Sequence, residues 1–199
     1  MEAQPKVPRF TDRAQAKDWI ENNVLERLHT VKTEHMDLLS MNQLQDVAEV
    51  LDDMKNKHGI QFHRIWVHPE EESKAMGQVL AYVHRPPYFE DQTTYELNIL
   101  YPGNDEQKQK IIDTTHQYGF TTEENFADTI RHEAGHLYLW KNPDVEEAAE
   151  ALFNSQSERT WKELSVYAST NYQELFAESF SVAGRNKYAD IVMKELFGK

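Results

Sequence analysis

The N-terminal part of the chain carries two stretches in which apolar side chains recur three or four positions apart. These stretches predict one helix over residues 12–28 and a second over residues 41–57. The second helix has clear boundaries, because Ser40 and Gln43 form a capping-box pair and Gly59 supplies a stop. The apolar positions are Trp19, Ile20, Val24, Leu25 and Leu28 in the first helix, and Leu44, Val47, Ala48, Leu51 and Met54 in the second.

A different pattern follows, in which short runs of β-branched and aromatic residues alternate with turn-forming segments. Three such runs, residues 60–67, 78–84 and 94–101, predict strands. We expect these strands to form a small, mainly antiparallel sheet. The last run partly alternates, with one face formed by Tyr95, Leu97 and Ile99.

The remainder of the chain reads as helical. Thr121 and Glu124 form a capping-box pair that predicts a helix over residues 122–140. Further helices are expected after Asn142-Pro143, Asn171 and Asn186, because each provides a cap residue before an apolar stretch. The polar segment 102–115 is expected to be a loop.

These elements predict one α+β domain over residues 1–199. It would consist of a helical part (1–60), a small sheet (60–101) and a second helical part (121–199). No segment between them resembles a long linker.

Composition excludes several classes of function. The chain has 21 basic and 34 acidic residues and a net charge of −13, which argues against nucleic acid as a partner. It has no Cys, which excludes disulfides, thiol nucleophiles and Cys-ligated zinc. No run approaches the roughly 20 apolar residues of a membrane span, and the N-terminus has no apolar signal-peptide core. We therefore expect no membrane partner and a cytoplasmic location.

Residues 132–136 form an HExxH motif within the predicted helix 122–140. His132 and His136 are separated by about 40° around a helix, so both imidazoles can bind one metal ion. Zinc is the default ion for two His and an oxygen ligand, with a fourth position open to water. Glu133 is offset by about 100°, which suits a general base. Gly135 suggests a close approach by a neighbouring backbone, although helices also tolerate glycine. The alternative is that both His are metal-free helix residues.

A third protein ligand is needed. Leu139 and Asn142 occupy the positions at which a three-His motif requires Gly and His, so that arrangement is excluded. Glu174 and Glu178 lie four residues apart on a predicted helix, so one can bind the metal while the other accepts a hydrogen bond from a ligand imidazole. Two solvated carboxylates are the alternative interpretation. The rival ligands are His116, Asp144, Glu146, Glu147 and Glu150.

Two segments of the chain resemble a known family. Residues 132–136 (HEAGH) and 165–180 (SVYASTNYQELFAESF) are similar to zinc metallopeptidases of the anthrax lethal factor-like group. They look closest to the metallopeptidase-like domains associated with phage head and minor capsid proteins. The phage-repressor-cleaving metallopeptidases share similar pieces, but their helix-turn-helix domain is not recognisable here. The resemblance is confined mainly to residues 126–182, so it does not identify a substrate.

The resemblance implies roles for individual residues. It selects Glu174 as the third zinc ligand, Tyr167 as a hydroxyl that assists at the scissile carbonyl, and Glu178 as the carboxylate behind a ligand imidazole. It also implies a lethal factor-like (gluzincin) fold, with a small sheet over the active-site helix and an edge strand that binds an extended peptide. A virion-associated location and a phage or bacterial protein partner follow as further possibilities.

Together, these features predict peptide-bond hydrolysis with one Zn²⁺ per chain, Glu133 as general base, and a peptide or protein as substrate. Residues 94–101 are a candidate edge strand, with Leu97, Asn98 and Ile99 in contact with substrate; an ordinary internal strand is the equal alternative. Other functions stay open: a phage or prophage structural protein that keeps a zinc site with little turnover, a zinc amidase acting on non-protein peptides, or an effector acting in another cell.

Overall fold

Two capped helices begin the fold. The computed structural model describes residues 6–26, 32–75, 80–85, 94–100 and 104–198. Helix α1 (Arg13–Asn23) begins after Asp12, and helix α2 (Met41–His58) begins at the predicted Ser40–Gln43 capping box. Both helices are confirmed, although α1 ends five residues earlier than expected. The segment between them forms a two-residue strand, β1 (Thr33–Glu34), and a short 3₁₀ helix, η1 (Met36–Leu38), neither of which was predicted.

The sheet is mixed, with four strands in the order β1-β2-β4-β3. The last three are β2 (Arg64–His68), β3 (Ala81–His84) and β4 (Glu96–Leu100). β1 and β4 both run parallel to β2, and only β3 is antiparallel to its neighbour. The expectation of a mainly antiparallel sheet is therefore wrong. The chain first forms β3, which is not adjacent to β2, and then forms β4 between these two strands. Local strand patterns do not encode such an insertion.

Of the two interpretations of residues 94–101, the internal strand is confirmed and the edge strand is wrong; residue 101 lies outside the described residues. β4 is paired with β2 on one side and with β3 on the other. Leu97 and Ile99 are fully buried in the core, and the Asn98 side chain lies 2.9 Å from the ring of His68. These three residues are thus unavailable for pairing with a peptide. β3 is an edge strand among the described residues.

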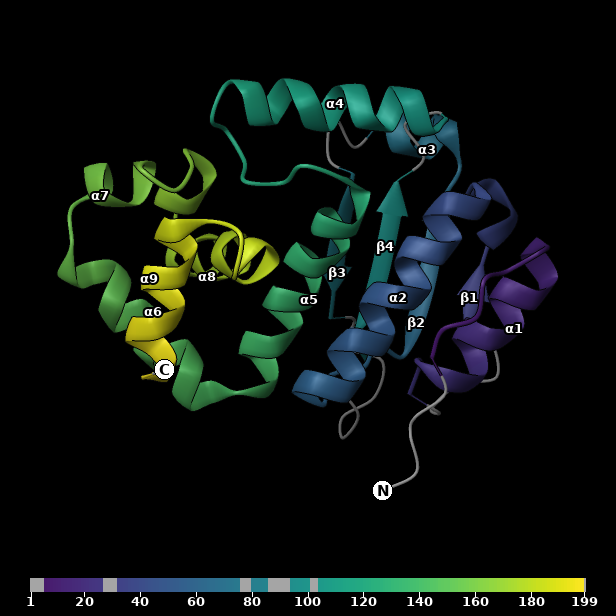
Figure 1. Ribbon diagram of the computed structural model, residues 1–199, viewed down its shortest axis with the longest axis horizontal. Coiled ribbons are helices and arrows are strands. Elements are labelled where there is room, and N and C mark those ends of the chain that lie inside the picture. Colours follow the sequence, from purple (N-terminus) through teal and green to yellow (C-terminus); the bar gives the residue numbers. More distant parts are fainter. Residues whose placement is uncertain (1–5, 27–31, 76–79, 86–93, 101–103, 199) are drawn as a thin grey trace.

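The main core lies between one face of the sheet and three helices. α1, α2 and α5 (Phe126–Lys141) cover that face, as Figure 1 shows. Alternation along β2 sends Ile65 and Val67 into the core and leaves Arg64, Trp66 and His68 on the other face. The core also includes these buried helix residues: Ile20, Leu44, Val47, Leu51, Ile130 and Leu137.

The described part of the segment 102–115, residues 104–115, is almost entirely helical, contrary to the expected loop; residues 102 and 103 lie outside the described residues. Helix α4 (Asp105–Gln117) begins at a capping box formed by Asn104 and Gln107, and it passes above the sheet and α5 in Figure 1. Its first residue, Asp105, accepts hydrogen bonds from Ser40 Oγ (2.7 Å) and Gln43 Nε2 (2.5 Å) at the start of α2. A short helix, α3 (Glu70–Ala75), follows β2.

The C-terminal half is helical and gathers on the side of α5 away from the sheet (Figure 1). α5 begins at Phe126, after an Asn125 cap, and not near residue 122 as predicted. Its successors are α6 (Pro143–Ser155), α7 (Glu158–Lys162), the 3₁₀ helix η2 (Tyr167–Ser169), α8 (Tyr172–Val182) and α9 (Lys187–Phe197). The caps at Asn171 and Asn186 are confirmed. Within the described residues, no helix has the length and apolarity of a membrane span.

Candidate metal centre and cleft

The site depends on a close contact between α5 and α8. Gly135 faces α8, and a Cβ added there would lie 3.0 Å from the Ala177 Cα atom. This distance is shorter than an ordinary contact, so a side chain at this position would require the backbone of Ala177 to shift. The predicted close backbone approach is therefore present. At the start of α8, the Asn171 side chain accepts a hydrogen bond from the Glu174 N–H, which places Glu174 in the first turn. The glycine and the cap together bring Glu174 to the HExxH face of α5.

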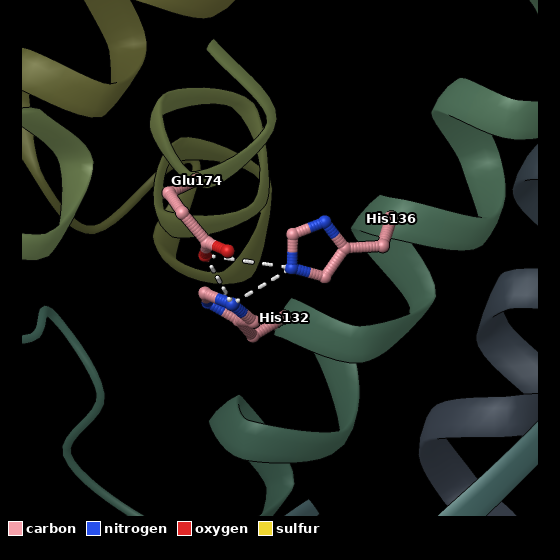
Figure 2. Close-up of side chains that lie close together, drawn as sticks. All are labelled: His132, His136 and Glu174. Atoms are coloured by element: carbon pink, nitrogen blue, oxygen red, sulfur yellow. Dashed lines mark hydrogen bonds and ion pairs between the residues drawn. The ribbon is translucent and has the colours of Figure 1, made fainter. Parts of the chain in front are cut away.

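Three side chains meet at one point between these helices (Figure 2). The Glu174 Oε2 atom lies 3.1 Å from His132 Nε2 and 3.5 Å from His136 Nε2, and the two Nε2 atoms are 3.2 Å apart. A tetrahedral ion with bonds of about 2.0–2.1 Å has ligand atoms roughly 3.3 Å apart. The spacing of the donor atoms therefore fits a tetrahedral metal ion, and the three residues are positioned to bind one.

The rear nitrogen of His132 faces carboxylates. His132 Nδ1 lies 3.3 Å from Glu178 Oε1 and 3.7 Å from Glu123 Oε1. Neither Nδ1 nor Glu178 Oε1 makes an aligned hydrogen bond, although both atoms are buried. The other Glu178 oxygen accepts hydrogen bonds from Thr122 N–H (2.6 Å) and Ser165 Oγ (2.9 Å). A metal on Nε2 leaves the imidazole proton on Nδ1, beside the oxygen that lacks a donor, so these groups also fit a metal site.

The charged groups of the site perturb one another. Burial alone would raise the pKa of Glu174, but hydrogen bonds from His132 and His136 outweigh burial and lower that pKa to about 2. Burial alone would lower the pKa of His132, yet Glu174 and Glu178 hold it well above its usual value. Burial raises the pKa of Glu123 to about 7. Glu174 is thus ionised at neutral pH, as a metal ligand must be.

Glu133 connects the helix to the sheet. Its side chain is buried beside the ligand group, and Oε2 accepts a hydrogen bond from the Val83 N–H of β3 at 2.9 Å. This bond fixes a carboxylate between the candidate metal ligands and an edge strand. Glu133 therefore has the place that a general base requires, next to the ligands but outside their triangle.

Tyr167 stacks on the metal-binding face. Its ring lies 5.9 Å from that of His132, with 12° between the ring planes, and the Phe120 ring stacks on its other side at 5.5 Å. The backbone N–H groups of Val166 and Tyr167 donate to the carbonyls of Gly119 and Phe120, each at 2.9 Å, which ties η2 to the segment before α5. Burial, followed by the charges of Glu174 and Glu133, raises the pKa of Tyr167 well above its usual value, so its hydroxyl stays protonated.

A cavity of about 680 Å³ opens onto these groups. One wall is residues 80–83, at and just before β3, and the floor includes the two His and Glu133. The opposite wall is formed by side chains of α4, the α4–α5 connection, η2 and α8: Ile111, Thr115, Phe120, Thr121, Glu123, Tyr167, Gln173 and Glu174. The volume is typical of a site for a small molecule or a few residues of a peptide.

The structure brings together the five predicted site residues that lie on α5 and α8, which are His132, Glu133, His136, Glu174 and Glu178. It places Tyr167 beside them. A second group of potential ligands, Glu123, His132 and Glu178, lies behind the first and shares His132 with it. The rival ligands belong to neither group among the described residues. Glu146, for example, bonds instead with Tyr172 and Gln173 on α8.

Sequence reasoning missed Val83, Thr122 and Glu123. Thr122 and Glu123 fell within the supposed start of a helix, yet the segment is not helical and its groups bond to Glu178 and Thr129. Val83 contributes only its backbone to Glu133, and no sequence signal marks such a contact.

No protein-family model, curated protein or solved structure matches this chain.

Proposed function

We propose that this protein is a zinc-dependent metallopeptidase of the lethal factor-like type. The observation that carries the proposal is the arrangement of His132, His136 and Glu174 beside Glu133, at the floor of an open cavity. A purely structural metal site is closed on all sides by protein ligands, whereas this group has three. A retained but inactive site also has no need of a carboxylate in the position of Glu133.

Zinc is the ion that this donor set favours. Two imidazole nitrogens and one carboxylate oxygen at tetrahedral spacing form a common catalytic zinc arrangement. When bound, the ion supplies a Lewis acid that polarises the scissile carbonyl and lowers the pKa of a water molecule.

The residues around the ion divide the remaining work. Glu133 accepts the proton that the attacking water loses, and then transfers it to the departing amine. Tyr167, which stays protonated, donates a hydrogen bond to the oxygen that gains negative charge. Glu178 accepts the Nδ1 proton of His132 and so holds the imidazole in the orientation that a ligand needs.

Strand β3 is the better candidate for substrate binding, in place of Leu97, Asn98 and Ile99. Leu100 N–H donates to the Leu80 carbonyl, so alternation along the pair turns the backbone groups of Ala81 and Val83 away from β4. The Val83 N–H already reaches Glu133, which means that these groups face the cavity. An extended peptide paired with β3 would therefore pass over the ligand group.

The test is Glu133→Gln, which removes the base and keeps the shape. We expect the variant to retain one zinc per chain, measured by elemental analysis, and to lose about 10²- to 10⁴-fold in hydrolysis of a peptide library. Glu147→Gln, on the exposed face of α6, is the matched control and should behave as wild type. Turnover of Glu133→Gln at a near wild-type rate would refute the assigned role.

The same assay separates the rival functions. A phage structural or interaction protein would bind zinc but cleave no member of the library. A zinc amidase would require Glu133 yet act only on non-protein peptides, such as cell-wall fragments, which should therefore be included.

A further inference from the structure

One acid in the cavity has no role in the proposed reaction. The titratable groups on the cavity wall are three carboxylates, two imidazoles and two phenols. Glu174 is a metal ligand and Glu133 is the base, whereas Glu123 is assigned to neither task. No Lys or Arg side chain is among the described residues that line the cavity.

The surroundings of Glu123 leave its charge poorly balanced. Its Oε2 atom accepts a hydrogen bond from the Thr129 hydroxyl at 2.5 Å, and its side chain is 12% exposed. Its other oxygen lies 3.7 Å from His132 Nδ1, and that nitrogen lies closer to Glu178, at 3.3 Å. A single Nδ1 proton cannot serve both carboxylates, and no Lys or Arg of the described chain pairs with Glu123.

Glu123 belongs to a cluster of four carboxyl groups, together with Glu133, Glu174 and Glu178, and the described residues that line the cavity supply no Lys or Arg to it. A ligand that brings its own cation would balance Glu123 in a partly desolvated position, where charge-assisted hydrogen bonds are strong.

The wall around Glu123 suits a long side chain with an apolar stem. Ile111 and Thr115 of α4 line the same cavity, together with Thr121 and Thr129, whose methyl groups extend the apolar surface. Lysine and arginine combine such a stem with a charged head. Because Glu123 lies so close to His132, the side chain that reaches it must belong to a residue next to the scissile bond.

We propose that Glu123 determines specificity for a lysine or arginine adjacent to the scissile peptide bond. This inference rests on the proposed peptidase function. It assigns the substrate class to basic peptides, and it makes the connection between α4 and α5 a substrate-recognition segment (Figure 1).

The experiment compares lysine with norleucine, which has the same stem without the ammonium group. Zinc-loaded full-length protein is given paired peptides that differ only at a residue flanking the cleaved bond, and paired amino-acid hydroxamates that bind zinc sites without being hydrolysed. We expect wild type to favour the lysyl form by about 10-fold or more, both in kcat/KM and in hydroxamate affinity. In Glu123→Gln both ratios should fall to near one. Glu124→Gln, at the adjacent exposed acid, is the control and should keep them.

Each outcome has one meaning. A wild-type ratio near one refutes the inference, as does a Glu123→Gln variant that loses activity equally on both peptides, because Glu123 would then act only through His132. If no peptide is cleaved but the lysyl hydroxamate binds more tightly in a Glu123-dependent manner, the inference holds and the peptidase proposal fails. Absence of both cleavage and preferential binding overturns both.

Discussion

Helix α5 carries two buried clusters one turn apart, and they differ in what completes them. Asp128 is fully buried and meets Arg185 through two contacts, at 2.5 and 3.2 Å, together with Arg131 at 2.9 Å and the Glu124 N–H at 3.1 Å. The next turn presents His132 and His136 to Glu174, with no Arg or Lys nearby in the described part of the cavity. The first cluster is complete within the protein, whereas the second is positioned to bind a metal ion.

The difference between the two clusters separates a structural network from a candidate functional site. In the Asp128 cluster, both carboxylate oxygens have donors, as a structural network requires. In the His132 cluster, donor atoms converge on one point and two buried atoms behind it, His132 Nδ1 and Glu178 Oε1, lack aligned partners. Unsatisfied buried groups are rare in structural networks, so they point to function.

The largest expected effect is on metal binding. Glu174→Gln should lower zinc affinity more than 100-fold, because replacing a ligand costs more than the about 10- to 100-fold typical of residues behind the ligands. Chelator competition measures the change. Asp128→Asn is the control and should keep wild-type affinity. Equal losses in the two variants would show that the clusters are not separable.

The two variants should rank in the opposite order in their effect on the free energy of unfolding. Asp128→Asn should lower the free energy of unfolding by about 2 kcal/mol, less than for a fully buried ion pair because Arg185 is 42% exposed. Glu174→Gln should have a smaller effect on the metal-free protein, because the amide oxygen of Gln can still accept a hydrogen bond from an imidazole and Glu178 stays beside His132. Urea unfolding in the presence of a chelator compares the two, and a larger loss for Glu174→Gln would contradict the distinction.

The smallest effect concerns a third buried charge, Lys108 of α4. Burial lowers its pKa from 10.5 to about 8, and its ammonium donates to a neutral partner, Gln43 Oε1, at 3.1 Å. Between pH 8 and 10.5 the unfolded chain therefore binds more protons at this residue than the folded chain, so its contribution to stability rises with pH. From pH 8 to pH 10, wild type should gain about 1–2 kcal/mol relative to Lys108→Met. Unfolding curves at several pH values test this, and parallel pH dependence in the two proteins would refute it.

Local sequence patterns predicted the parts of the site that depend on helical spacing. His132, Glu133 and His136 lie on one helix, and Glu174 and Glu178 lie on another. The helical period and the capping residues were therefore sufficient to predict how the side chains are placed within each helix. Gly135 even indicated the contact between the two helices. Contacts made by irregular segments were not predictable in this way. Glu123 reaches the site because the chain before α5 is not helical and bonds with Glu178 and Thr129.

The sheet and α4 illustrate the same limit. Polar positions in β4, such as Glu96 and Asn98, favoured an exposed strand, but both are buried because their neighbours supply partners in three dimensions. In α4, Asn104 and Gln107 did provide a capping signal, which the polar composition of the segment obscured. Polar contacts with Ser40 and Gln43 hold α4 against the start of α2. A search for apolar positions at helical spacing does not detect such contacts.

The close contact at Gly135 has a consequence for ionic size. Because a Cβ at this position would meet the backbone of Ala177, any other residue would force α5 and α8 apart by tenths of an ångström. Glu174 would then move away from both imidazoles. Bonds from ligand atoms to zinc are about 2.0–2.1 Å long and bonds to calcium are about 2.3–2.6 Å long, so the two also differ by tenths of an ångström. The radius of the ion that fits is therefore set in part by a residue that bonds to no ion, through the methyl group it lacks.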